Sequence, residues 1–146
     1  MATHEWFLPS DQRKALSTYL ADFVNAVPVH LFVKNGLNDA YANFARKLLE
    51  DMVQLSDKIA LILHVDDAVA NEQYKVERFP TLLIAPDKYS IRFSGAPAGE
   101  EGQAFLQALL MVSTQKSFLS EPSRKLLEEL DTPRDVKVFV SPTCPY

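Results

Sequence analysis

Apolar residues recur along the first half of the chain in two alternating patterns, which predict helices and strands in turn. Between Ser10, the expected N-cap, and Pro28, the expected end, apolar side chains follow the 4-3-4 spacing of a helix face turned toward a core. Residues 29–33 and 59–65 are nearly continuous apolar runs, typical of strands buried on both faces of a sheet. Residues 41–55 lie between these runs and repeat with a period near 3.6, which predicts a second helix. The apolar helix positions are Leu16, Leu20, Phe23 and Val27, then Tyr41, Phe44, Ala45, Leu48, Leu49, Met52 and Leu55.

The following part of the pattern begins with a short helix over residues 68–76 and continues with two short strands, 81–85 and 91–93. The turn Pro86–Lys88 separates these strands, so we expect a hairpin. A long helix starts near Glu100. Strand-helix-strand followed by strand-strand-helix predicts an α/β domain with a thioredoxin-like fold, in which a central mixed sheet is flanked by helices on both faces. The apolar positions of the long helix are Phe105, Leu106, Leu109, Leu110 and Val112.

Phe79, Pro80 and Thr81 form the corner that precedes the first strand of this hairpin. An X-Pro bond just before a strand is a place where cis proline is used, although the sequence leaves the isomer open. A proline at the mouth of a strand also leaves an unpaired backbone edge beside it, with which an extended peptide can pair. We therefore predict that these three residues form a proline loop at the functional site.

The composition is that of an ordinary globular protein. With 146 residues, of which 47% are hydrophobic and 23% charged, the chain is long enough for one domain with a real core. A net charge of −4 without a cluster of Lys or Arg argues against a nucleic-acid partner. Apolar runs are too short for a membrane span, and the first residues lack the pattern of a secretory signal. Cys144 is the single cysteine, which excludes a disulfide within the chain, and these features together predict a cytoplasmic location.

The last part of the chain repeats its beginning. Residues 122–127 resemble residues 9–16, and the apolar run 136–140 resembles the first strand. The two copies lie about one domain length apart, which favours a duplicated domain over a short-period repeat. We therefore predict a complete unit in residues 1–119, followed in residues 120–146 by the first helix and strand of a second such unit.

A reactive thiol is predicted where the strand of the second unit ends. Cys144 follows that strand at the entry to an expected helix, whose positive end would stabilise a thiolate. The stretch Thr143-Cys144-Pro145-Tyr146 resembles the beginning of the Cys-Pro-Tyr-Cys motif of glutaredoxins and of the tandem glutaredoxin-like protein disulfide oxidoreductases. The chain also resembles the N-terminal domain of the flavoprotein subunit of alkyl hydroperoxide reductase, which likewise joins two thioredoxin-fold units. The likeness extends to the proline loop and to residues 93–99.

This resemblance implies a thiol–disulfide relay. Cys144 would be the attacking thiol of the second unit, and that unit would be the first partner of residues 1–119. A redox protein or a peroxidase would be the partner in exchange, and FAD and NAD(P)H would bind in a downstream domain of a longer protein. The resemblance implies no cofactor in the chain itself, and the chain would be inactive alone. In the alternative interpretation, Cys144 is an ordinary thiol.

The first unit lacks the thiols that the resemblance would place in it. Counting from the first strand puts the pair at Leu37 and Ala40, whereas counting back from the following helix puts it at Asp39 and Ala42. Neither register contains a cysteine, and without a thiolate there is no nucleophile to attack a disulfide sulfur. The first unit is therefore predicted to be redox-inactive. The alkyl hydroperoxide reductase relative also lacks this pair, which favours that branch of the resemblance.

Four polar residues beside the strands have both a structural and a functional interpretation. His30 and His64 lie among apolar neighbours, with no cysteine or acidic cluster spaced for a metal ion, which favours structural histidines. Asp66 and Asp67 follow a strand, where they could form a pair of catalytic carboxylates. A cap on the following helix is the favoured role for one of them.

Three functions remain open at this point. The favoured one is a redox-inactive scaffold that holds the second unit in a disulfide oxidoreductase. The second is a non-catalytic module that binds extended peptides at the Pro80 edge, where Tyr41 and Phe79 would line a groove instead of belonging to the core. The third is a homodimerisation domain, in which the long helix from Glu100 supplies an apolar seam.

Overall fold

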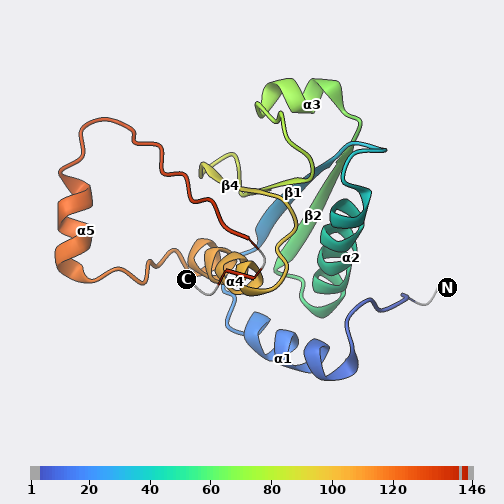
Figure 1. The fold of residues 1–146 in the computed structure, drawn as a ribbon. Coiled ribbons are helices and arrows are strands. Elements are labelled where there is room, and N and C mark those ends of the chain that lie inside the picture. The colour runs from blue at the N-terminus through green and yellow to red at the C-terminus, as the bar shows by residue number, and fades with distance from the viewer. Residues whose placement is uncertain (1–3, 142, 145–146) are drawn as a thin grey trace.

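The computed structural model describes residues 4–141, 143 and 144 of the chain, and Figure 1 shows their arrangement. Helices and strands alternate from α1 to β3, and a second strand, β4, follows β3 directly, as the apolar pattern predicts. In chain order the elements are α1 Ser10–Leu20, β1 Val27–Val33, α2 Asp39–Leu55, β2 Ile59–Val65, α3 Ala68–Gln73, β3 Thr81–Ile84, β4 Ile91–Ser94, α4 Glu100–Thr114 and α5 Glu121–Glu128.

The four strands form one mixed sheet in the order β2-β1-β3-β4. Strands β1 and β2 pair in parallel from Val27 with Ile59 to Val33 with Val65, and α2 makes the crossover between them. Strand β3 runs antiparallel to both of its neighbours, β1 and β4, so the predicted hairpin is present. This α/β arrangement confirms the predicted thioredoxin-like sheet.

Most of the core lies on one face of the sheet, beneath α1, α2 and α4. Val29 and Leu31 point to this face from the centre of β1 and are fully buried. The apolar residues of α4 also pack here, with Phe105 and Leu109 buried. Each fully buried side chain of this size contributes about 1.5–3 kcal/mol. The apolar residues of α4 that the homodimer hypothesis would place at a subunit interface therefore pack against the core of the same chain.

The second face of the sheet is covered by α3 and the segment that follows it. A small cluster forms there around Phe32 of β1 and Leu83 of β3, against which Ala70 and Val76 pack. Helices therefore lie on both faces, as predicted, but they cover the two faces unequally.

The structure corrects the predicted end of the first helix. Helix α1 ends at Leu20, and the chain is already in β1 at Val27 and Pro28. The 4-3-4 spacing misled because Phe23 and Val27 are buried from a loop and a strand instead of from a helix. The buried Ser113 hydroxyl of α4 holds this connection, because it accepts hydrogen bonds from the backbone N–H groups of residues 24 and 25 at 2.9 and 3.1 Å. The expected N-cap Ser10 is likewise one residue off, since Pro9 occupies the cap position.

Strand β2 also differs from its prediction. It was expected to be buried on both faces, yet it forms one edge of the sheet and only Ile59 within it is buried. An edge strand has a neighbour on one side alone, so its outer side remains open.

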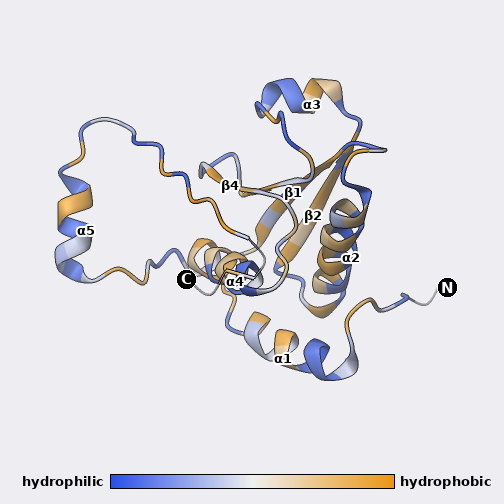
Figure 2. Cartoon of the chain, in the orientation of Figure 1, coloured by the Kyte–Doolittle hydropathy of each residue, from blue (hydrophilic) through white to orange (hydrophobic). Residues whose placement is uncertain are grey.

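The C-terminal segment leaves the body of the protein. Helix α5 forms as predicted, and its cap residue Ser120 accepts a hydrogen bond from the N–H of Ser123 at 3.3 Å. Helix α5 buries none of its residues, and Figure 2 shows hydrophobic positions on it although it lies apart from the sheet.

The predicted strand over residues 136–140 is wrong. These residues are described but form no strand, and Val136 and Phe139 are 85% and 84% exposed. A strand needs a neighbouring strand to pair its backbone groups, and nothing in the described part of the chain pairs with this one.

Within the ranges that the structure describes, no helix is both long and apolar enough to cross a membrane.

Candidate functional site

The loop that would carry a dithiol connects β1 to α2 and is held by side-chain hydrogen bonds. Asn35 donates to Asp66 through its backbone N–H at 3.1 Å and through its side-chain amide at 2.6 Å. The N–H of Gly36 donates to the Asp39 carboxylate at 2.9 Å. Gly36 has a φ of 79°, a value that glycine adopts without strain. Polar contacts therefore fix this loop at the surface.

The four residues of the two dithiol registers lie in different surroundings. Leu37 precedes α2 and is 44% exposed, and Asp39 and Ala40 are exposed in the first turn of that helix. Ala42 is buried, 7% exposed. The two residues of the first register, Leu37 and Ala40, are therefore both at the surface, whereas the second register includes a buried position.

The proline loop lies beside this dithiol loop. The Phe79–Pro80 peptide bond is cis. The side-chain amide of Asn38 donates to the carbonyl of Phe79 at 2.8 Å, so one hydrogen bond links the two loops. Thr81, which is buried, donates from its hydroxyl to the carbonyl of Arg78 at 2.7 Å. The structure thus brings the dithiol loop and the proline loop together, as the prediction of Tyr41 and Phe79 beside one site required.

Asn38 is the residue that sequence reasoning missed. It occupies the N-cap position of α2 with φ 56° and ψ 38°, in the left-handed region. Asparagine is several-fold enriched among non-glycine residues in this conformation, and an Asn between a Gly-containing turn and a helix is the sequence signal that could have identified it.

Phe79 and Tyr41 have different environments. Phe79 is half-buried and packs against the small cluster on the α3 face of the sheet. Tyr41 is 54% exposed on α2. Phe79 therefore contributes to the core, while Tyr41 lies at the surface.

The two histidines form a hydrogen-bonded chain with Asp67. His64 Nδ1 lies 3.3 Å from the Asp67 carboxylate, and His64 Nε2 lies 3.0 Å from His30 Nδ1. Because an ionised carboxylate only accepts, His64 Nδ1 donates to it; when the His64 ring is neutral, its Nε2 accepts from His30 Nδ1. Burial, and next the proximity of His64, lower the pKa of His30, while Asp87 opposes this shift. The histidines are thus structural partners of each other.

Asp67 caps α3, as the favoured interpretation predicted. Its carboxylate accepts a hydrogen bond from the N–H of Ala70 at 3.0 Å. This backbone hydrogen bond, and next the one with His64, lower the pKa of the Asp67 carboxyl. Among residues 4–141, 143 and 144, no group of three or more His, Cys, Asp or Glu side chains is placed to hold a metal ion.

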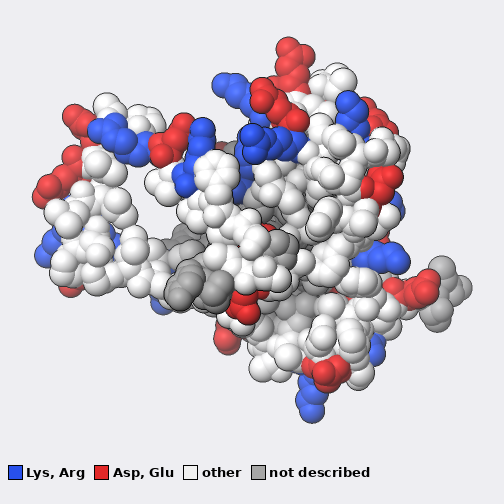
Figure 3. Space-filling model, viewed as in Figure 1, with Lys and Arg blue, Asp and Glu red and all other residues white. Residues whose placement is uncertain are grey.

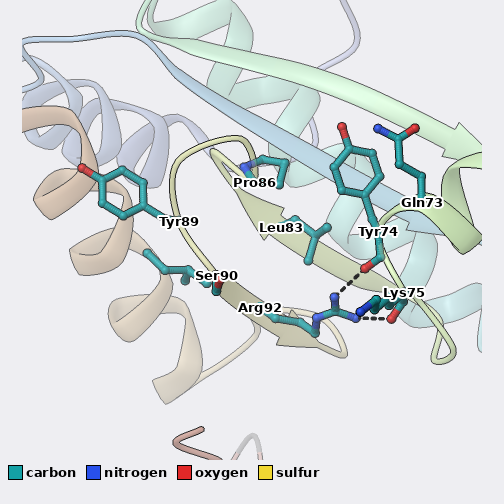
Figure 4. A pocket seen from close by; sticks show the side chains of 9 residues that line it. Gln73, Tyr74, Lys75, Leu83, Pro86, Tyr89, Ser90 and Arg92 are labelled. Atoms are coloured by element: carbon teal, nitrogen blue, oxygen red, sulfur yellow. Dashed lines mark hydrogen bonds between the residues drawn. The ribbon is translucent and has the colours of Figure 1, made fainter. Parts of the chain in front are cut away.

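A shallow hollow of about 230 Å³ lies between the end of α3 and the β3–β4 hairpin, as Figure 4 shows. Arg92 spans it and donates to the carbonyls of Tyr74 and Lys75, each at 2.7 Å. The residues that line the hollow do not include any predicted site residue. Figure 3 shows acidic and basic side chains interspersed over the face in view.

Cys144 belongs to the segment that follows α5. It is half-buried, and its backbone N–H donates to the carbonyl of Ser141 at 2.9 Å. Thr143 is exposed, and Pro145 and Tyr146 lie outside the described residues. In Figure 1 the described part of the segment after α5 lies on the opposite side of the sheet view from the dithiol loop between β1 and α2.

Comparison with known proteins gives one curated relative and several solved structures. The relative is the F subunit of alkyl hydroperoxide reductase from Xanthomonas campestris pv. phaseoli, which is 27% identical over 130 residues, 88% of this chain. The chain spans 23% of the length of that protein. No protein-family model matches the chain.

Two solved structures extend this likeness. A protein disulfide oxidoreductase from Aeropyrum pernix K1 matches with a TM-score of 0.83 and 26% identity, over 97% of this chain and 64% of its own. The NTD_N/C domain of alkyl hydroperoxide reductase from Enterococcus faecalis matches with a TM-score of 0.67 and 25% identity, over 82% of this chain and 59% of its own. In both cases the chain spans less than two thirds of the matched structure.

The sheet, its helices and these likenesses define the fold of the chain, which is thioredoxin-like. The chain resembles a protein disulfide oxidoreductase and, in sequence as well, the F subunit of alkyl hydroperoxide reductase and its N-terminal domain.

Proposed function

We propose that this chain is the first part of a longer thiol–disulfide oxidoreductase of the alkyl hydroperoxide reductase type and that its first unit is a redox-inactive scaffold. The observation that carries the proposal is a thioredoxin-like unit whose dithiol loop contains no thiol. Leu37, Asp39, Ala40 and Ala42 occupy both registers, so this loop has no sulfur to attack a disulfide. The loop is instead fixed by hydrogen bonds from Asn35 and Asn38.

Residues 120–146 are, in this proposal, the beginning of the second unit. The match to the Aeropyrum pernix oxidoreductase covers 97% of the chain, so it continues well beyond the end of α4 at Thr114. Exposed apolar side chains occur along the same segment. Their burial against the rest of the second unit would remove a large apolar surface from water. The most exposed of them are Leu126, Leu127, Val136, Val138 and Phe139.

The chemistry would take place at Cys144. Its thiolate attacks one sulfur of a partner disulfide, and the other sulfur leaves as a thiolate. A second thiol of the same unit then breaks the mixed disulfide, which leaves the partner reduced and the unit oxidised. In the longer protein, FAD and NAD(P)H would supply the electrons that reduce the unit again. A peroxidase or another redox protein would be the partner, and a reducing cytoplasm would keep such a thiol available.

Replacement of Cys144 in the longer protein tests this proposal. We expect Cys144→Ser to abolish reduction of a disulfide substrate, because serine cannot form the mixed disulfide. Ser141→Ala is the matched control, since it keeps the backbone carbonyl that accepts from Cys144, and it should retain activity. Undiminished activity of Cys144→Ser would contradict the assignment.

A further inference from the structure

The carbonyl groups of Phe79 and Pro80 in the proline loop, and of Arg78 just before it, each accept a hydrogen bond from within the chain. Those of Arg78, Phe79 and Pro80 accept hydrogen bonds from the Thr81 hydroxyl at 2.7 Å, the Asn38 amide at 2.8 Å and the Gly95 N–H at 2.8 Å. An extended peptide that adds to a backbone edge needs such carbonyls as acceptors for its N–H groups. The loop predicted to bind a peptide therefore has its acceptors already paired.

The three donors have different origins. Thr81, the last residue of the loop, is also the first residue of β3, and Gly95 follows the neighbouring strand β4, so both contacts are part of the sheet corner. Asn38 alone comes from the dithiol loop, between the positions of the first dithiol register. It is also exposed, and so is its hydrogen bond with Phe79.

The backbone holds Asn38 in this position. The carbonyl of Asn38 accepts hydrogen bonds from the N–H groups of Tyr41 and Ala42, each at 3.0 Å, as α2 begins. Its left-handed conformation directs the chain from the turn into the helix. The side chain thus reaches Phe79 from a residue whose backbone is itself fixed by the start of α2.

We propose that Asn38 is a specificity-determining residue that closes the proline loop of the first unit to extended peptides. This inference deepens the proposed function and rests on it, because a scaffold beside an active second unit would compete for substrate if its own loop bound peptide. The Asn38 amide occupies one acceptor position of the Phe79 carbonyl. A peptide that pairs there must displace this amide or share the oxygen with it, so the net gain in hydrogen bonding is reduced.

A tethering experiment measures this closure in the full 146-residue chain. Cys144→Ser removes the native thiol, and Leu37→Cys places a thiol at an exposed residue next to Asn38. The new thiol of the protein is first converted to its mixed disulfide with glutathione. The protein is then equilibrated with reduced glutathione and a seven-residue peptide of alternating valine and threonine that carries one central cysteine. Each exchange replaces one mixed disulfide with another and releases the displaced thiol, so atoms and electrons balance. Mass spectrometry gives the ratio of the peptide adduct to the glutathione adduct.

With Asn38 present, we expect the ratio to stay within about twofold of that for a small unfolded cysteine peptide used as reference. Asn38→Gly keeps the left-handed conformation and frees the Phe79 carbonyl. It should raise the ratio about fivefold to tenfold, the value of one backbone hydrogen bond in a tethered complex. Asn38→Asp keeps the size of the side chain but replaces the donor with an acceptor, and it should raise the ratio as well.

Two controls separate closure from general loosening of the loop. Asn35→Ala removes the side-chain contact with Asp66 but leaves Asn38 in place, so the ratio should not change. An N-methylated peptide cannot donate to Phe79 and should lose the gain seen with Asn38→Gly.

An unchanged ratio in both Asn38 variants would overturn the proposal, and so would an equal rise in Asn35→Ala. Loss of the folded circular dichroism spectrum in both Asn38 variants would also overturn it, because Asn38 would then be required for folding. The assay contains no Cys144, so its failure would leave the activity test of the proposed function untouched.

Discussion

Helices α1 and α5 begin with similar sequences and have different surroundings. Leu16 of α1 and Leu127 of α5 occupy matching positions in the repeat, but Leu16 is 8% exposed and Leu127 is 52% exposed. Helix α1 contacts α2 over the main core, whereas α5 buries no residue. Both segments are helical because a helix makes its hydrogen bonds within itself. The similar sequences of α1 and α5 therefore give the same local structure, a helix, but only α1 is packed against the core.

The apolar runs after these helices differ more. Residues 27–33 form the centre of the sheet, whereas residues 136–140 form no strand in the described structure. A strand obtains its backbone partners from neighbouring strands, so an apolar run becomes a strand only where such a neighbour exists. The comparison shows that the helix of the repeat forms without packing partners, whereas its apolar run does not form a strand.

The largest expected effect comes from the matched leucines. Leu16→Ala should lower the free energy of unfolding by about 2–4 kcal/mol, because it leaves a cavity in the core. Leu127→Ala should change it by less than about 0.5 kcal/mol, because an exposed side chain loses little on truncation. Chemical denaturation followed by circular dichroism measures both. Equal losses would show that α5 is packed in solution.

The next effect concerns residues 4–8, the arm that precedes α1 and is held to α2. The fully buried Asp51 carboxylate of α2 accepts hydrogen bonds from the N–H of Phe7 at 3.1 Å, the N–H of Leu8 at 2.7 Å and His4 Nε2 at 2.7 Å. Asp51→Asn should cost about 2–3 kcal/mol of unfolding free energy, because bonds to a charged acceptor are lost.

A surface carboxylate of α5 provides the control for Asp51. Glu121 forms an ion pair with Lys125 at 3.1 Å, and both side chains are largely exposed. Glu121→Gln should change the unfolding free energy by less than about 0.5 kcal/mol, because water screens this pair. Urea denaturation compares the two variants. A similar loss for both would contradict the assignment of Asp51 as the anchor of the arm.

A smaller effect is expected from the cap of α5. Ser120→Ala removes the acceptor for the N–H of Ser123 and should destabilise α5 by about 1 kcal/mol. The thermal midpoint of the body should stay the same, since α5 does not pack on it. Carbon chemical shifts of residues 121–128 report the helix, and calorimetry reports the body. A shift of the calorimetric midpoint would show that the two are coupled.

The smallest effect is the pH dependence of the histidine chain. Burial lowers the pKa of His30 below its ordinary value of 6.5, so the unfolded chain takes up this proton more readily than the folded one. Stability from this residue is therefore complete above pH 6.5 and declines as the pH falls below it. Titration of His30 by NMR checks the direction. His64→Gln should move the pKa of His30 upward, and a His30 pKa above 6.5 in the unaltered chain would contradict the assignment.

Sequence reasoning succeeded where local pattern and packing agree. The apolar run 59–65 became β2 with the same bounds, and Asp67 caps α3 as expected. It failed at Val27, because burial from a loop and a strand imitated the period of a helix. It also missed Asn38, because a contact with Phe79 across 41 residues depends on the tertiary fold.

The proposed role of Cys144 rests on the resemblance and the repeat. The geometry of the sheet and of its described loops plays no part in this assignment. Residues 136–140 can test the repeat against the structure, because they would pair as a strand only if the other strands of a second unit were present.

Hydrogen exchange of residues 136–140, measured by mass spectrometry, tests the central claim most directly. In this chain their backbone amides should exchange at nearly the rate of an unstructured peptide. In the longer protein, pairing within the second unit should slow them by at least about a hundredfold. Equal, rapid exchange in the longer protein would contradict the claim that this segment begins a second thioredoxin-like unit.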